Sequence, residues 1–307
     1  PGQAVSYMLR SPVAHASVRS IDTSAALAAP GVIAVYTGAD VAALGGTPCF
    51  APKLVPLTRP DGSALYEPKR PMLVKDKVAF VGDYVSFVVA ETRAQAKDAA
   101  ELIVVDYEEL PPIVEISDAL AKNGAVLWDD CPNNICFTME QGNCAATDAA
   151  FEAAHHTSSV EIPYARVAIN PMEPRAAIGE YDPFEDRYTL HAGNQFPHDI
   201  RSWLAGGVLK VPESKLRIVS PDMGGSFGLR STCFPELALT VWAAKQLGRP
   251  VKWVNERSEG ILEEHARDFT ATVELALDRA GTFLGCLLYT SDAADEGLGV
   301  DLGGRRI

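Results

Sequence analysis

The chain has 307 residues, of which 47% are hydrophobic and 22% charged, an ordinary composition for a globular protein of about two domains. Its formal net charge of −13 argues against nucleic acid or an anionic membrane surface as a partner. No apolar run approaches the roughly 20 residues that span a bilayer, and no signal-peptide pattern opens the chain, so we expect a cytoplasmic protein.

The first 118 residues are predicted to form a small mixed α/β domain. Residues 31–38 are an apolar run bounded by glycine, which is typical of a strand. Residues 41–76 are rich in proline and glycine and show little periodicity. We therefore expect a long loop there.

The rest of this domain contains a hairpin signal and a helix signal. Residues 77–90 hold two β-branched and aromatic runs joined by the Gly82-Asp83 pair, and glycine first in a two-residue connection is the signature of a type II′ hairpin. Thr92 is expected to cap an alanine-rich helix over 93–102. Residues 103–110 then return as a strand.

A connector and a second domain are predicted to follow. Residues 119–150 are dominated by turn-forming residues, and the second domain is expected over 151–285. In it, strand patterns occupy 187–193, 215–222, 250–256 and 267–278, and helical patterns occupy 198–211 and 234–247. Pro235 suits the first turn of the latter helix, and Gly248 suits its C-terminal cap.

The cysteines and histidines carry no metal-site pattern. The chain has six cysteines, at positions 49, 131, 136, 144, 233 and 286. None forms a Cys-x-x-Cys pair, and the spacing of Cys131 and Cys136 has no second pair to complete a zinc or iron–sulfur site. We therefore expect scattered reduced thiols. His155 and His156 are adjacent and would point apart on a helix or strand, so we expect surface residues there.

The stretch "PDMGGSFGLR", residues 221–230, places three glycines between a predicted strand and a predicted helix. A tight connection by itself needs glycine. Alternatively, the backbone N–H groups of such a loop cradle a phosphate or a cofactor. The spacing matches neither the P-loop nor the Rossmann fingerprint, so the loop has no recognisable nucleotide signature.

The same stretch contains a literal G-x-S-x-G around Ser226, the pattern of a hydrolase nucleophile elbow. That reading needs an acid and then a histidine after the serine, and His265 is the only histidine downstream. Pro235 also places the expected helix start several residues after Ser226, whereas the helix of an elbow begins at the serine. A nucleophilic Ser226 is therefore a weaker interpretation of this stretch than a structural loop or a ligand cradle.

Several long stretches, in matching order and spacing, resemble the molybdenum hydroxylases, the family of xanthine dehydrogenase, aldehyde oxidase and the large subunit of aerobic carbon monoxide dehydrogenase. Stretches 11–41 and 77–111 resemble the family's α/β-hammerhead domain. Stretches 170–182, 191–209 and 221–261 resemble the first part of its mixed α/β molybdenum–pterin domain. The resemblance covers residues 5–285 and implies an α+β fold.

The resemblance implies a cofactor site at the glycine loop. The backbone at Phe227 and Gly228 would lie against the ligand sphere of a molybdenum ion held by a pterin dithiolene, and the amide of Gln195 would lie near the metal. Ser226 stands where many relatives have glycine and is interpreted as a small loop residue, Arg230 as a positioning residue, and Glu173 as a structural charge rather than a base. The cofactor-binding residues expected on this basis are Gln195, Gly224, Gly225, Ser226, Phe227, Gly228 and Arg230.

The resemblance implies part of the catalytic subunit of a molybdenum-dependent oxidoreductase. Such enzymes hydroxylate aldehyde or N-heterocycle carbons, or oxidise carbon monoxide, using water. It further implies molybdopterin, in its plain or cytosine dinucleotide form, and partner subunits that carry iron–sulfur clusters and FAD, in a dimer of heterotrimers. The family's general-base Glu lies near the end of a much longer chain and has no counterpart here, so we expect no turnover by this chain alone. A non-catalytic scaffold of the same fold and a serine hydrolase at Ser226 are the alternatives.

Residues 286–307 depart from the family pattern. "CLLYTSDAADE", at the start of this tail, looks like translated sequencing adapter, and the chain begins with Pro1 rather than Met. We therefore expect a fragment of a longer gene product with a non-native tail.

Overall fold

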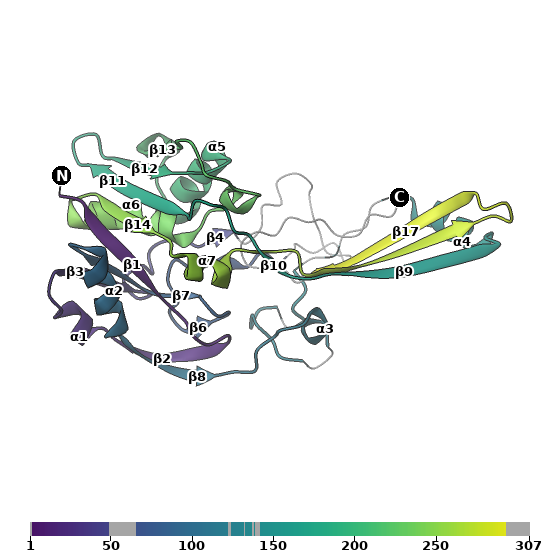
Figure 1. Ribbon diagram of the computed structural model, residues 1–307, viewed down its shortest axis with the longest axis horizontal. Helices are drawn as coiled ribbons and strands as arrows, with labels where there is room; N and C mark the ends of the chain where they lie inside the picture. Colours follow the sequence, from purple (N-terminus) through teal and green to yellow (C-terminus); the bar gives the residue numbers. More distant parts are fainter. Residues whose placement is uncertain are drawn as a thin grey trace. The chain divides into compact units, whose positions relative to one another are not determined.

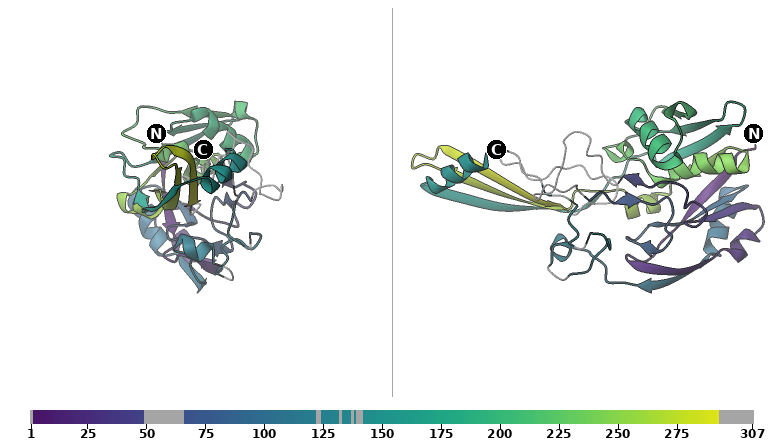
Figure 2. Two further views of the ribbon diagram at one scale, coloured as in Figure 1. Left: turned by 90° about the vertical axis from the view of Figure 1, so that its right-hand side faces the viewer. Right: turned by 180° about the vertical axis from the view of Figure 1, so that it is seen from behind.

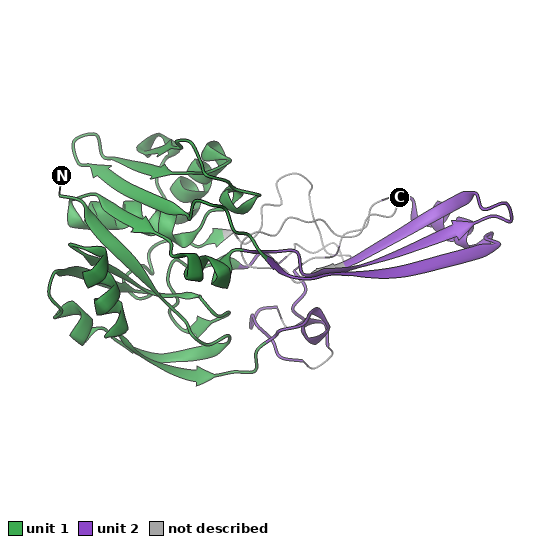
Figure 3. Cartoon of the chain, viewed as in Figure 1, with its two compact units in different colours: residues 1–49, 69–112, 168–264 green, residues 50–68, 113–167, 265–307 purple. Residues whose placement is uncertain are grey.

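The computed structural model describes residues 2–48, 66–121, 124–131, 133–136, 138 and 142–292. The chain divides into two compact units (Figure 3): unit 1 comprises residues 1–49, 69–112 and 168–264, and unit 2 comprises residues 50–68, 113–167 and 265–307. Among the described helices, none combines the length and the hydropathy that crossing a membrane requires. The predicted domain boundaries, at residues 118, 150 and 285, stay a sequence-based prediction.

Unit 1 is built on a seven-stranded mixed sheet with the order β13-β12-β11-β14-β1-β7-β3 (Figure 1). In chain order its strands are β1 (Ala4–Arg10), β3 (Val32–Thr37), β7 (Tyr84–Ala90), β11 (Ala176–Asp182), β12 (Arg187–Ala192), β13 (Leu216–Val219) and β14 (Val251–Val254). The pairs β1–β14 and β12–β13 are parallel, and the other neighbours are antiparallel. One sheet therefore joins strands from distant parts of the sequence.

Smaller elements complete unit 1. A three-stranded antiparallel sheet contains β2 (Ala16–Asp22), β6 (Lys77–Val78) and β8 (Val104–Glu109), and a two-stranded one contains β4 (Thr47–Pro48) and β5 (Lys69–Arg70). The α-helices are α1 (Ser24–Leu27), α2 (Arg93–Glu101), α5 (Pro197–Ser202), α6 (Pro235–Leu247) and α7 (Arg257–Glu263). A π-helix, η2 (Trp203–Leu209), continues α5, and two short 3-10 helices are η3 (Glu213–Lys215) and η4 (Leu229–Ser231).

Buried side chains pack on both faces of the large sheet of unit 1, whose strands and helices are drawn in Figures 1 and 2. Side chains alternate along a strand, so Phe87 and Val89 of β7 join the cluster that contains the buried face of α6, whereas Val88 and Ala90 join the cluster that contains α2. β7 is consequently buried along its whole length. The predicted helix at 234–247 is the buried helix of this core.

The structure confirms most of the predicted elements, but the hairpin over 77–90 is wrong. β6 pairs with β2, not with β7. Gly82 does have a positive φ, of 99°, but it is the third residue of a turn closed by the N–H of Asp83 donating to Phe80 O at 3.2 Å. Glycine at that position suits a type II turn, so the glycine signal was real and its turn type was misassigned.

Thr92 caps α2 as predicted, because its Oγ1 accepts a hydrogen bond from the N–H of Gln95 at 3.3 Å. Replacing Thr92 by Ala removes this acceptor and is expected to lower the free energy of unfolding by about 1 kcal/mol, measured by urea denaturation. Thr92→Ser keeps the acceptor and should stay close to the wild type. Equal losses in the two variants would contradict a capping role.

Unit 2 contains a three-stranded antiparallel sheet with the order β17-β16-β9. Its strands are β9 (His156–Tyr164), β16 (Phe269–Leu277) and β17 (Phe283–Asp292), and its helices are α3 (Ile116–Ala119) and α4 (Cys144–Glu152). α4 packs on β17 and β16. The short strands β10 (Val167–Ala168) and β15 (His265–Ala266) lie where the chain passes from one unit to the other.

The predicted connector contains a helix that the sequence analysis did not predict. α4 begins after Asn143, whose Oδ1 accepts a hydrogen bond from the N–H of Ala146 at 3.0 Å. The first residues of the predicted tail, from Cys286 to Asp292, belong to β17 and pair with β16 from Leu275 to Phe269. Residues 293–307 lie outside the described residues, and the non-native origin of the tail stays a prediction.

Candidate functional site

The glycine-rich loop lies between β13 and α6, where the sequence predicts it. Gly225, Phe227 and Gly228 have positive φ angles of 112°, 54° and 92°. This backbone region is open to glycine but rarely adopted by a bulky residue. Phe227 adopts it with 79% of its surface exposed. The loop is therefore held at the surface in an uncommon conformation, as segments that bind ligands often are.

Four consecutive N–H groups of this loop, from Gly225 to Gly228, donate no hydrogen bond to any described residue. The N–H of Arg230, by contrast, donates to Ser226 Oγ at 3.1 Å. Successive N–H groups in a loop with left-handed residues form a concave cradle for electronegative ligand atoms. A Cβ built at Gly228 would meet no atom within 4 Å, so the cradle is open at that residue. These features fit a cofactor that needs close backbone approach.

Gln195 lies beside the loop, in the connection from β12 to α5. Its N–H donates to Arg230 O at 2.9 Å, and Ser226 Oγ donates to Gln195 Oε1 at 2.6 Å. The side chain of Gln195 is exposed, and its Nε2 donates to no described residue. The structure therefore brings Gln195 and the loop together and leaves an amide donor available next to the cradle.

The geometry around Ser226 does not form a nucleophile elbow. Its hydroxyl is engaged with Gln195 and with the N–H of Arg230, and among the described residues no histidine bonds to it. The helix that follows, α6, begins at Pro235, after the short η4 turn. A nucleophile needs an adjacent base within hydrogen-bond reach, and Ser226 has none in the described part of the chain.

Glu173 contacts the loop in a way that the sequence analysis did not predict. Its Oε2 accepts a hydrogen bond from the N–H of Gly224 at 2.5 Å. Nη2 of Arg230 donates to the backbone O of Glu173 at 2.7 Å and to its Oε2 at 3.3 Å. The partners lie far apart in the sequence, and "PMEPRA" has no local pattern that indicates a loop contact, so only the fold reveals it.

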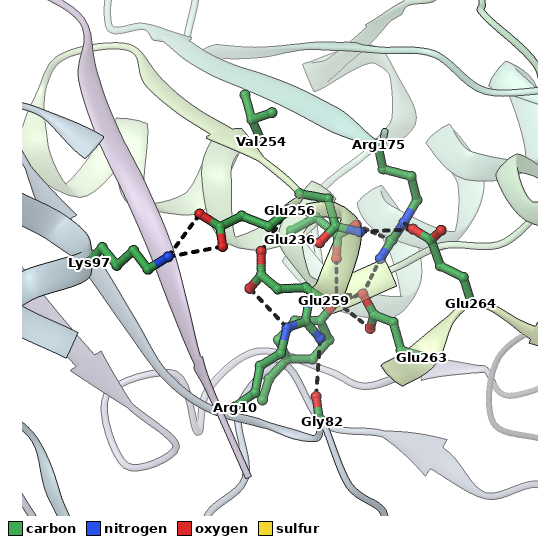
Figure 4. A network of polar contacts seen from close by, with 12 residues as sticks. Arg10, Gly82, Lys97, Arg175, Glu236, Val254, Glu256, Glu259, Glu263 and Glu264 are labelled. Carbon is green, nitrogen blue, oxygen red and sulfur yellow. Dashed lines mark hydrogen bonds and ion pairs between the residues drawn. The ribbon is translucent and has the colours of Figure 1, made fainter. Parts of the chain in front are cut away.

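A cluster of buried charges surrounds Arg175, two residues after Glu173 (Figure 4). Arg175, just before β11, bonds to Glu236 of α6, to Glu263 of α7 and, at 2.8 Å, to Glu264. Glu263 also pairs with Arg10 at 2.9 Å and with Arg70 at 3.2 Å. The aromatic ring of Phe234 lies 3.5 Å from the guanidinium carbon of Arg175. This cluster ties both helices to the segment that carries Glu173.

The hydroxyl of Tyr84 lies between two carboxyl groups of the cluster, those of Glu236 and Glu263. Its oxygen lies 2.9 Å from Glu236 Oε2 and 2.7 Å from Glu263 Oε2, but a phenol has only one proton to donate. Burial raises the pKa of Glu236 more than the attraction of Arg175 lowers it. Burial acts on Glu263 too, but Arg10, Arg175 and Arg70 outweigh it and hold the pKa of that carboxyl well below its usual range. Of the two carboxyls, Glu236 is therefore the one that binds a proton more readily.

Metal-ligating clusters are absent from the described residues: no group of three or more His, Cys, Asp or Glu side chains could hold a metal ion. Of the described cysteines, Cys233 and Cys286 are free thiols. The candidate site is therefore a backbone cradle with an amide and a guanidinium beside it.

Two curated relatives resemble the chain over most of its length. The carbon monoxide dehydrogenase large chain of Hydrogenophaga pseudoflava is 36% identical, over 97% of this chain and 37% of the relative. The nicotine 6-hydroxylase large subunit of Paenarthrobacter nicotinovorans is 35% identical, over 92% of this chain and 34% of the relative. The chain thus spans about a third of the length of these relatives.

A solved structure and two family matches agree with this similarity. Quinoline 2-oxidoreductase from Pseudomonas putida 86 matches with a TM-score of 0.83 and 33% identity, over 94% of this chain and 36% of that one. Residues 1–111 match the a/b hammerhead domain of aldehyde oxidase and xanthine dehydrogenase, and residues 127–297 match the molybdopterin cofactor-binding domain. These matches confirm the α+β fold expected from the resemblance. The chain therefore belongs to the molybdopterin-binding family of aldehyde oxidases and xanthine dehydrogenases.

Proposed function

We propose that this chain forms part of the molybdenum–pterin site in the large subunit of a molybdenum-dependent oxidoreductase. The observation that carries the proposal is the open cradle of four consecutive N–H groups at the glycine loop. The residues proposed to contact the cofactor or to position those contacts are Gln195, Gly224, Gly225, Ser226, Phe227, Gly228 and Arg230.

When bound, the molybdenum–pterin group would supply the oxidation chemistry, with water as the source of oxygen. The chain's own residues bind and orient it. The N–H groups from Gly225 to Gly228 offer donors, and Nε2 of Gln195 offers another. Ser226 holds the amide of Gln195 by donating to its Oε1, so that the nitrogen of that amide faces away from the serine.

The activity of the whole protein follows from the same proposal. The names of the relatives describe carbon monoxide dehydrogenase and nicotine 6-hydroxylase, and a similar structure is a quinoline oxidoreductase. They support an aldehyde, an N-heterocycle or carbon monoxide as substrate of this protein. The terms large chain and large subunit in those names support smaller partners, which we assign to iron–sulfur and FAD subunits in the cytoplasm. The cofactor is proposed to be molybdopterin, in its plain or cytosine dinucleotide form.

Replacing Gly228 by Val in the full-length subunit is expected to reduce bound molybdenum and pterin at least tenfold. A branched side chain strains a backbone with positive φ and narrows the open cradle. Molybdenum is measured by elemental analysis of the purified complex, and the pterin and any released cytidine nucleotide by chromatography.

Gly248→Val is the matched control. Gly248 also has a positive φ, of 64°, and open space around its Cβ position, but it caps the far end of α6. Gly248→Val should introduce similar backbone strain and leave the molybdenum and pterin content unchanged. Equal cofactor loss in both variants would contradict a specific cradle, and a folded wild-type protein without molybdenum or pterin would favour the non-catalytic scaffold.

A further inference from the structure

Both ends of the cofactor loop are tied to the same residue. At the first end, the N–H of Glu173 donates to Gly224 O at 3.3 Å, and the N–H of Gly224 donates back to Glu173 Oε2 at 2.5 Å. At the other end, Nη2 of Arg230 donates to Glu173 O at 2.7 Å and to Glu173 Oε2 at 3.3 Å. Glu173 thus closes the segment from Gly224 to Arg230 into a clasped loop.

Two glycines lie in close contact with this clasp. A Cβ at Gly224 would lie 2.5 Å from Glu173 Cβ, and a Cβ at Gly193 would lie 2.6 Å from Nη1 of Arg230. Neither distance is one that real Cβ atoms tolerate, because these atoms would overlap. Gly224 is therefore required by the approach of Glu173, and a side chain at Gly193 would have to displace the guanidinium of Arg230.

The clasp uses none of the N–H groups that form the cradle. It engages Gly224 and Arg230, while the N–H groups between Gly225 and Gly228 stay without a described partner. The side chain of Arg230 is only 3% exposed, whereas that of Glu173 is 46% exposed, so the carboxylate joins a buried cation to the surface where the loop lies. Arg175, two residues on, is fixed in the buried charge cluster, and its O accepts from the N–H of Asn255 at 2.9 Å.

We propose that Glu173 is a positioning residue, which holds the loop in the conformation that presents its N–H groups to the cofactor. The proposal rests on the proposed function of the loop. Glu173 itself touches no cradle N–H; it acts through Gly224 and Arg230. A charged acceptor makes a stronger bond to an N–H or a guanidinium than a neutral one does, so the carboxylate is better suited to this task than an amide.

The test uses the full-length subunit, purified with its partners, in three variants. Glu173→Ala removes the acceptor, and Glu173→Gln keeps an oxygen but not the charge. Glu185→Gln is the control, because Glu185 is exposed and its carboxylate pairs with Arg187 at 3.1 Å. The readouts are molybdenum and pterin content, the electron paramagnetic resonance signature of the metal, the melting temperature, and hydrogen exchange of the peptide covering 221–231.

Glu173→Ala is expected to lose at least fivefold in cofactor content or to change the resonance signature, with faster exchange in the loop peptide. Its melting temperature should stay within a few degrees of the wild type. Glu173→Gln should restore part of the loss, and the control should match the wild type. If Glu173→Ala fails to fold, the same comparison between Glu173→Gln and the wild type decides.

The outcomes separate this inference from the proposed function. A loaded wild type with unchanged cofactor content, signature and loop exchange in Glu173→Ala overturns the positioning role alone. A wild type that folds without cofactor overturns the proposed function, and loop exchange then still reports whether Glu173 clasps the loop. A general fall in melting temperature, with no specific change in the loop, would also overturn the positioning role.

Discussion

Replacing Glu263 by Gln is expected to lower the free energy of unfolding by about 3–5 kcal/mol, which is the range for breaking a buried ion pair from one side. The side chain of Glu263 is 1% exposed and bonds to Arg10, Arg70 and Arg175. The amide cannot compensate those guanidinium groups, so they would stay buried with too little negative charge. Urea denaturation at neutral pH measures the loss.

Glu236→Gln is the matched variant, and it should cost less than about 1 kcal/mol. Glu236 lies in the same cluster and is fully buried, but its raised pKa makes it the more readily protonated of the two carboxyls. A glutamine there can accept from Arg175 and donate to Tyr84, whose hydroxyl then donates to Glu263. Similar losses in the two variants would contradict this distribution of protons.

The two carboxyls also have opposite effects on the pH dependence of stability. The pKa of Glu236 is raised above 4.5 in the folded protein, so its contribution is complete at low pH and is lost as the pH rises through the raised pKa. The pKa of Glu263 is lowered, so its contribution is present above about pH 4.3, where the unfolded chain titrates, and is lost as the pH falls. Glu236→Gln should therefore remove a decline of stability that begins above about pH 4.3, and it should leave the acid-side loss due to Glu263 in place.

Replacing Gly179 by Ala is expected to lower the free energy of unfolding by about 3 kcal/mol. Gly179 lies in β11, directly under α6, and a Cβ there would lie 2.3 Å from the backbone C of Thr240 and 2.4 Å from the N of Val241. The obstructing atoms belong to the backbone of a buried helix and cannot rotate away. α6 would have to move off the sheet, which the close-packed core resists.

Gly206→Ala is the control for this variant, because a Cβ at Gly206 would meet no atom within 4 Å. Alanine is favoured over glycine in helical segments, so the control should be neutral or slightly stabilising in the same urea titration. A loss at Gly206 equal to that at Gly179 would show that the general loss of glycine, rather than the contact with α6, causes the effect.

Local signals in the sequence predicted the local structure well. The cap at Thr92, the proline and glycine that bound α6, and the strands β12, β13 and β14 were all predicted from neighbouring residues, because caps and alternation are short-range effects. The hairpin predicted around Gly82 was wrong because the pairing of one strand with another is not a short-range effect. Its glycine conformation is local, but the partner of β6 is chosen by the rest of the sheet.

The candidate site shows most clearly which features follow from the sequence and which depend on the tertiary structure. The sequence by itself determined the family, through its resemblance, and the glycine loop with Gln195 as its neighbour. Only the tertiary structure decided that Glu173 clasps the loop and that Arg175 meets Glu236 and Glu263. A buried charge is tolerated only where opposite charges converge on it, and such convergence joins residues that the sequence keeps far apart.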